Sequence, residues 1–176
     1  MNFQEMREAF LTETGLVDSE LDDSKIAQWF NEAQLDLAWE LGKAKKYIYE
    51  NTNGGEYDLP DDCLRIVKCS AGYKINDVGK IEFDNDGNIT LTYVSIPADF
   101  TATNLEQVSE LHQSLHYLMV YFAASRYFDQ ESEGDTEESN HATKWMNYYL
   151  MGKNNAIARL RKLLNSSNTL EKWTVI

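Results

Sequence analysis

The chain has 176 residues, which is long enough for one domain with a substantial hydrophobic core. Its 29 acidic residues outnumber 16 basic ones and give a formal net charge of −13. This balance argues against a general nucleic-acid-binding protein, because such a protein needs a basic surface to release phosphate counterions. No stretch approaches the roughly 18 consecutive apolar residues of a transmembrane helix, so no membrane partner is expected.

The first 42 residues predict two amphipathic helices. Phe3, Met6 and Phe10 recur at helical spacing, and Gly15 follows as a stop signal. The second helix is expected to end at about Gly42. Its apolar stripe repeats at steps of three and four residues and consists of Ile26, Trp29, Phe30, Ala33, Leu37 and Leu41.

A β insertion is predicted between about residues 47 and 96, where turn residues alternate with short β-prone runs. Strands are expected at Tyr47–Tyr49, Glu56–Leu59 and Arg65–Tyr73, with a turn at Asn53–Gly55. Further along, apolar and polar residues alternate on both sides of a turn signal, which predicts an antiparallel hairpin. Its inward-facing residues are Ile81, Phe83, Ile89, Leu91 and Tyr93.

The register of this hairpin follows from the alternation of side chains. A three-residue loop, Asn85-Asp86-Gly87, places Phe83 opposite Ile89 and Ile81 opposite Leu91, and it needs Gly87 in the left-handed conformation. The same stretch has the beginning of an EF-hand calcium loop, with Glu82, Asp84 and Asp86 at its first three ligand positions. Position 12 is Tyr93, where a bidentate glutamate is required, so the hairpin is favoured.

The residues that could carry chemistry form no known catalytic motif. Cys63 and Cys69 would lie about 20 Å apart in one extended strand, so free thiols are expected. His112 and His116 have the spacing of two metal ligands on one helix, but Gln113 stands where a zinc protease has glutamate. His116 is expected to be a packed or interface histidine. We therefore expect no catalytic residues, no metal and no cofactor, and the chain is predicted not to be an enzyme.

A third helix is predicted to begin with a cap near Thr103 or Asn104. Its apolar stripe is Leu105, Val108, Leu111, Leu115, Leu118, Met119 and Phe122. The segment Tyr117–Ala124 is apolar almost all round, which indicates burial by its own domain or by a neighbouring subunit. The residues expected to pack between subunits are Tyr117, Val120, Tyr121 and Ala124.

A last helix is predicted over Glu137–Asn165. Its apolar positions are Trp145, Tyr148, Tyr149, Ile157, Leu160, Leu163 and Leu164. From Lys153 onward, five basic residues stand against the single acid Glu171. This basic end forms either a solvated helix face or a surface that meets an acidic partner.

The order of these signals resembles the head-to-tail adaptor (connector) proteins of tailed bacteriophages. In that family a Y-x-L-P-x-D-hydrophobic segment leads into strands, a strand ends in hydrophobic-x-Y-x-x-x-P, and a long helix runs into an Ala-rich aromatic stretch. The matching segments are YDLPDDCLRIV at Tyr57–Val67, ITLTYVSIPADF at Ile89–Phe100 and SELHQSLHYLMVYFAASRYF at Ser109–Phe128.

This resemblance implies a mainly α (α+β) fold, in which a helical bundle over residues 1–165 carries the inserted β-hairpin or small sheet. The family's subunits form a ring, twelve-fold in this expectation, that joins the portal protein to a downstream tail or tail-completion protein. The ring belongs to the neck of the virion, after assembly in the host cytoplasm. It continues the channel for genome ejection, and DNA passes through it without specific binding.

The last eleven residues, 166–176, are polar and then abruptly apolar, which predicts a C-terminal docking tail. Trp173, Val175 and Ile176 are its expected anchors on the portal or on an adjacent subunit. Other functions stay open at this point. These are another tail-completion or head-closure protein of the virion, an acidic DNA mimic that inhibits a nucleic-acid-handling enzyme, and a small hydrolase that uses carboxylates.

Overall fold

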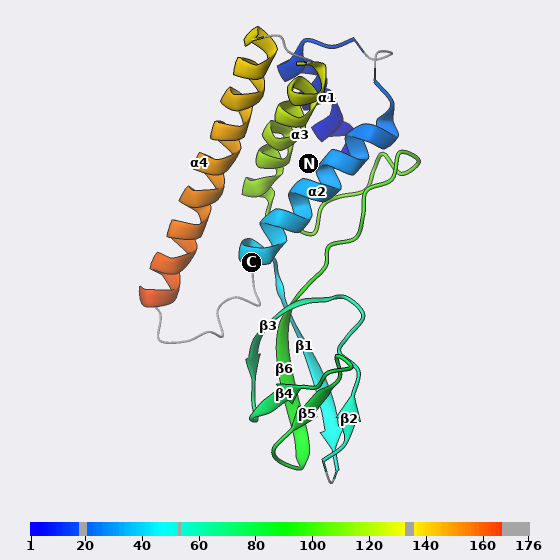
Figure 1. Ribbon diagram of the computed structural model, residues 1–176, viewed down its shortest axis with the longest axis vertical. Coiled ribbons are helices and arrows are strands. Elements are labelled where there is room, and N and C mark those ends of the chain that lie inside the picture. Colours follow the sequence, from blue (N-terminus) through cyan, green and yellow to red (C-terminus); the bar gives the residue numbers. More distant parts are fainter. Residues whose placement is uncertain (18–20, 53, 133–135, 167–176) are drawn as a thin grey trace. The chain divides into compact units, whose positions relative to one another are not determined.

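The computed structural model describes residues 1–17, 21–52, 54–132 and 136–166 (Figure 1). Over these residues the fold is α+β and mainly helical, as predicted. The elements are α1 (Phe3–Thr14), α2 (Asp23–Leu41), β1 (Ala44–Asn51), β2 (Glu56–Tyr57), β3 (Cys63–Cys69), β4 (Tyr73–Ile75), β5 (Ile81–Phe83), β6 (Gly87–Ser95), the short 3₁₀ helix η1 (Gln113–Leu115), α3 (His116–Glu131) and α4 (Thr136–Ser166).

The chain forms two compact units. The helical unit comprises the described residues of 1–41 and 97–166, and the β unit comprises Gly42–Ile96. No helix in the described part of the chain is long and apolar enough to span a membrane.

Helices α1 and α2 confirm the two helices predicted at the start of the sequence. The α1 N-terminus is closed by a capping box, in which the Asn2 side chain accepts from the Glu5 amide and the Glu5 carboxylate accepts from the Asn2 amide. Gly15 ends the helix in the left-handed conformation, with φ of 74°. The apolar stripes of both helices are buried in the core of the helical unit.

The third helix begins at His116, so the predicted start near Thr103 or Asn104 is wrong. Residues 97–112 form an irregular loop instead, because its backbone groups find partners outside it. The Phe3 amide donates to the Gln107 carbonyl, at 2.8 Å, and the Gln4 amide donates to the Leu105 carbonyl, at 2.9 Å. These bonds to the start of α1 replace the helical hydrogen bonds that the apolar spacing had predicted.

Two amide side chains of α2 fix the beginning of the same loop. Asn31 both donates to the Phe100 carbonyl, at 3.0 Å, and accepts from the Phe100 amide, at 2.7 Å. Gln34 donates to the Ala98 carbonyl, at 2.9 Å. The Phe100 ring is thereby held in the core, where it packs against Phe3 and Phe30.

Helix α4 confirms the predicted last helix and runs along α3 (Figure 1). A β-carbon added at Gly152 would overlap the Leu118 side chain, so the two helices approach closely at this point. Trp145 and Tyr149 are buried as predicted, whereas Tyr148 is exposed. The side chains of Leu163 and Leu164 lie outside the described residues.

The β unit contains two three-stranded antiparallel sheets, with strand orders β1-β6-β3 and β2-β5-β4. The predicted hairpin is wrong, because β5 and β6 belong to different sheets. Ile81 is paired with Tyr57 and Ile75, and Leu91 is paired with Tyr47 and Cys69. Strands β4 and β5 form a hairpin of their own, closed by the Asn76 amide donating to the Lys80 carbonyl at 2.9 Å.

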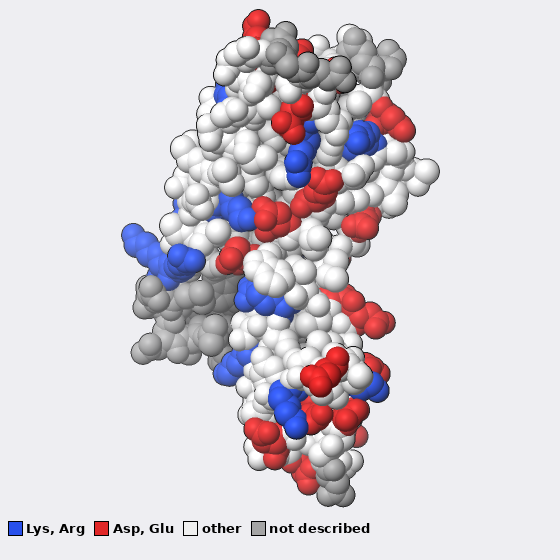
Figure 2. Space-filling model, in the orientation of Figure 1, with Lys and Arg blue, Asp and Glu red and all other residues white. Residues whose placement is uncertain are grey.

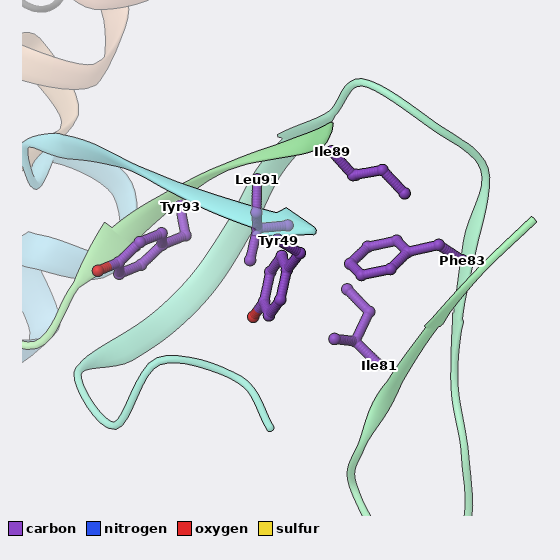
Figure 3. Packing of buried hydrophobic residues seen from close by; sticks show 6 residues of the cluster. All are labelled: Tyr49, Ile81, Phe83, Ile89, Leu91 and Tyr93. Atoms are coloured by element: carbon purple, nitrogen blue, oxygen red, sulfur yellow. The ribbon is translucent and has the colours of Figure 1, made fainter. Parts of the chain in front are cut away.

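The alternation of side chains nevertheless identified the buried faces correctly. Apolar residues of the two sheets point toward one another and form one core, so they meet face to face instead of side by side (Figure 3). Gly87 has φ of 107°, which confirms its predicted positive value. The core cluster consists of Tyr49, Ile81, Phe83, Ile89, Leu91 and Tyr93.

The strand predicted at Arg65–Tyr73 is divided into β3 and β4. At the break, Ser70 exchanges hydrogen bonds with Thr90, and the Asp84 amide donates to the Gly72 carbonyl at 3.0 Å. A β-carbon at Gly72 would overlap the Asp84 carboxylate, so a larger residue at this position would require the Asp84 side chain to move. Cys63 and Cys69 lie at the two ends of β3 as free thiols, as predicted.

Candidate functional site

An aromatic cluster lies on the surface that α3 and α4 share. Tyr117 and Tyr121 come from α3, and Trp145 and Tyr148 come from α4. The Tyr121 ring stacks on Trp145, with centroids 5.6 Å apart, and lies 5.8 Å from Tyr148. Tyr117 lies 5.4 Å from Tyr121. We call these four residues the α3–α4 aromatic cluster.

Two of the four rings in the cluster are exposed to solvent. Tyr117 and Tyr148 are each 41% exposed. The Lys144 ammonium lies 5.0 Å from the Trp145 ring centroid and 5.9 Å from that of Tyr148, which are cation–π distances. Aromatic residues on rigid helices offer a large contact area at a low cost in side-chain entropy, and such residues dominate many interfaces.

Hydrogen bonds and burial fix the positions of the cluster residues. The Tyr117 hydroxyl donates to Glu13 of α1, at 3.2 Å, which ties the edge of the cluster to a second helix. Trp145 is only 6% exposed, and its indole nitrogen has no hydrogen-bond acceptor among the described residues. The cluster therefore combines buried and exposed rings, as the edge of a protein interface does.

The residues predicted to pack between subunits divide into two pairs. Tyr117 and Tyr121 belong to the aromatic cluster. Val120 and Ala124 are fully buried within the chain itself, so in this structure their side chains contact other parts of the helical unit. The predicted docking anchors Trp173, Val175 and Ile176 lie outside the described residues.

A polar network on the other side of α4 holds this helix against α2. The Asp36 carboxylate accepts hydrogen bonds from the Tyr149 hydroxyl and from the Lys153 ammonium, the latter at 2.6 Å. Burial, reinforced by the bond to Asp36, raises the pKa of Tyr149 well above its ordinary value. Lys153 therefore forms an ion pair within the chain. The sequence alone had grouped it with the other basic residues near the end of α4.

His116 is a packed histidine, as predicted. It is 2% exposed, its Nε2 donates to the Leu111 carbonyl at 3.0 Å, and its Nδ1 accepts from the Met1 amino group at 2.9 Å. His112 instead contacts Ser114, at 2.9 Å. Within the part of the chain that the structure describes, no group of three His, Cys, Asp or Glu side chains is placed to hold a metal ion.

The environment of His116 makes stability depend on pH. Burial lowers the pKa of His116 below its ordinary value of 6.5, and the nearby Met1 amino group and His112 act in the same direction. The bond to Leu111 and the charge of Glu5 act in the opposite direction. The unfolded chain therefore binds a proton at a higher pH than the folded chain does.

We expect the free energy of unfolding to decrease as the pH falls from about 7.5 to 5.5, because the unfolded state takes up the proton first. Urea unfolding at several pH values measures this slope. His116→Gln is expected to flatten it, whereas His141→Gln, at a histidine of α4 that is not among the groups acting on His116, is expected to keep it. An equal slope in the wild type and in His116→Gln would contradict this account. Asp62 and Glu82, whose pKa values are lowered mainly by Lys45 and Lys74, act in the same direction at more acidic pH.

Part of the chain is similar to a known protein family. Residues 1–85 match the family model of the SU10 adaptor protein. The matched stretch is just under half of the chain and contains α1, α2 and the strands from β1 to β5. The match is a likeness to an adaptor family over this part of the chain. No curated protein matches the chain.

The match and the aromatic cluster lie in different parts of the sequence. The match ends at residue 85, whereas Tyr117, Tyr121, Trp145 and Tyr148 all follow it. The likeness therefore concerns the first half of the chain, and the aromatic cluster is an independent observation from its second half. Both are consistent with a protein that works by contacting other proteins.

Proposed function

We propose that the chain is a head-to-tail adaptor of a tailed bacteriophage, one subunit of a ring that joins the portal protein to the tail. The observation that carries this proposal is the likeness of residues 1–85 to the SU10 adaptor protein. The α+β organisation and the exposed aromatic cluster support it, because a ring subunit needs contact surfaces in addition to its own core.

The proposed ring has twelve subunits and continues the DNA channel from the portal to a downstream tail or tail-completion protein. The net charge of −13 suits such a channel, since a surface that binds DNA tightly would retain the genome. The chain's place in this proposal is the neck of the virion, where it acts by binding and not by catalysis.

The C-terminal docking tail is the proposed contact with the portal. Removal of residues 166–176 is expected to abolish binding to the portal ring of the same phage while leaving the helices folded. Co-sedimentation with purified portal rings measures binding, and circular dichroism measures folding. The deletion removes the apolar anchors and with them the proposed contact area on the portal.

A matched pair of variants refines this experiment. The triple substitution Trp173→Ala, Val175→Ala and Ile176→Ala is expected to have the effect of the deletion. Thr174→Ala, which changes the residue between the first two anchors, is expected to bind normally. Unchanged portal binding by the deletion variant would disprove docking through this tail.

A further inference from the structure

Positive charge is concentrated on α4. Between Ser139 and Ser166 the helix carries five basic residues and no acid, although the whole chain has a net charge of −13. Lys and Arg side chains gather where α4 ends (Figure 2). The rest of the chain has 11 basic residues (16 less 5) against all 29 acidic ones, so it is strongly negative. The basic residues of α4 are Lys144, Lys153, Arg159, Arg161 and Lys162.

Three of these bases share a helix face with exposed apolar residues. Steps of three and four residues place Lys144, Tyr148, Met151, Asn155, Arg159 and Lys162 on one side of α4. Tyr148 is 41% exposed and Met151 is 60% exposed. Lys144, Arg159 and Lys162 are exposed and form no ion pair with the described residues. We call this face the basic stripe.

A surface of opposite charge lies on the loop of residues 97–112. This loop carries Asp99, Glu106 and Glu110 and no lysine or arginine. Between the acids lie the exposed side chains of Leu105 and Val108, the latter 59% exposed. We call these five residues the acidic loop face.

Hydrogen bonds to other parts of the helical unit hold the acidic loop face in place. Backbone hydrogen bonds join it to the start of α1, and the Asn2 side chain donates to Glu106 at 2.9 Å. The Gln107 side chain donates to the Asp99 carbonyl at 2.8 Å. The acids are therefore presented in a fixed arrangement, as an interface requires.

The two surfaces lie on different sides of the helical unit. Helix α3 packs against α4 on one side and against α1 on another (Figure 1). The basic stripe runs along α4 beside its contact with α3, where Tyr148 meets Tyr121, and the acidic loop face is bonded to the start of α1. Helix α3 packs against both α4 and α1, so it lies between the two faces within one chain.

We propose that the basic stripe of one copy of this chain packs against the acidic loop face of a second copy. Both faces have an apolar centre flanked by charges, and the charges are opposite. Two basic stripes would repel one another, so a two-fold contact between stripes is disfavoured. The contact is heterologous, and repeated heterologous contacts close into a ring when the rotation permits. This inference rests on the proposed ring function and assigns its subunit contact to residues.

The experiment uses two full-length charge-reversed variants. Variant one carries Lys144→Glu, Arg159→Glu and Lys162→Glu, so both of its faces are acidic. Variant two carries Glu106→Lys and Glu110→Lys, so both of its faces are basic. Sedimentation velocity at low salt is expected to show association of each variant alone at least about tenfold weaker than that of the wild type.

An equal mixture of the two variants is the decisive sample. In this mixture the acidic α4 face of variant one can pack against the basic loop face of variant two. The basic α4 face of variant two can likewise pack against the acidic loop face of variant one. The mixture is expected to regain wild-type association with alternating subunits, which native mass spectrometry detects as a 1:1 composition. No recovery in the mixture, or no self-association of the wild type at about 1 mM, overturns the proposal. Circular dichroism verifies that both variants are folded.

Two further readouts separate this contact from other functions. A short DNA duplex that binds the wild type but not variant one, in the absence of self-association, would assign the basic stripe to nucleic acid and overturn the proposal. Portal binding is measured independently. Self-association through the two faces without portal binding would refute the adaptor function and leave the contact intact.

Discussion

Phe30→Ala is expected to lower the free energy of unfolding of the helical unit by about 3–5 kcal/mol, because it removes the centre of an aromatic core. The Phe30 ring is fully buried and lies 5.8 Å from Phe3 and 6.3 Å from Phe100. Phe3 and Phe100 stack on each other, with centroids 5.7 Å apart. Truncation leaves a cavity where α1, α2 and the loop of residues 97–112 meet.

Urea unfolding followed by circular dichroism measures this loss. Leu35→Ala on the same helix is the matched control, because Leu35 is 44% exposed and its truncation leaves no buried cavity. The control is expected to change the free energy of unfolding by less than about 1 kcal/mol. A loss of less than about 1 kcal/mol in Phe30→Ala would show that the three rings do not form the core described here.

The double variant Tyr117→Ala and Tyr148→Ala is expected to weaken association by about tenfold to a hundredfold with little loss of stability. Both side chains lie at the exposed part of the α3–α4 aromatic cluster, so their truncation leaves no buried cavity. An association of this kind depends on a few large aromatic anchors, and each tenfold change corresponds to about 1.4 kcal/mol. Sedimentation velocity of the chain, alone and with the portal, measures the effect.

The control for this variant is Tyr73→Ala in strand β4. Tyr73 is also 41% exposed, so the two experiments remove side chains of equal accessibility from different surfaces. Tyr73→Ala is expected to assemble as the wild type does. If both variants weaken assembly equally, the α3–α4 aromatic cluster has no special part in it.

Helices α1, α2 and α4 could be predicted from sequence because their signals are local. Apolar spacing, a capping box and a glycine stop all lie within the segments that they define. The start of α3 could not be predicted in this way. The loop before it keeps helical spacing at Leu105, Val108 and Leu111, but its hydrogen-bond partners are near Phe3 and Asn31, far away in the sequence.

The β unit shows a second limit of local reasoning. Alternation predicted which side chains of Ile81–Phe83 and of the following strand face a core, because side-chain direction has a period of two. It did not identify the partner strand. Two strands joined by a short loop can pair in one sheet or enter two facing sheets, and both arrangements bury the same residues. The choice depends on β1 and β3, which flank β6, and on β2 and β4, which flank β5.

The candidate site was predicted in part. The apolar segment of α3 led to Tyr117 and Tyr121, but Val120 and Ala124 are used within the chain itself. The spacing in α4 places Tyr148 among the same apolar positions as the buried Trp145, since spacing alone does not show which ring reaches the surface. The bond network of Asp36, Tyr149 and Lys153 joins helices separated by more than a hundred residues, so no pattern in the sequence indicated it.

The most direct test of the adaptor function is the mass of the purified chain by light scattering, first alone and then with a portal ring of the same phage. The account predicts that the chain joins the portal as a ring whose mass equals one copy for each portal subunit. A chain that remains unbound at any portal concentration would contradict this function. Tight binding to a basic DNA-handling enzyme in place of the portal would identify the chain as an acidic DNA mimic.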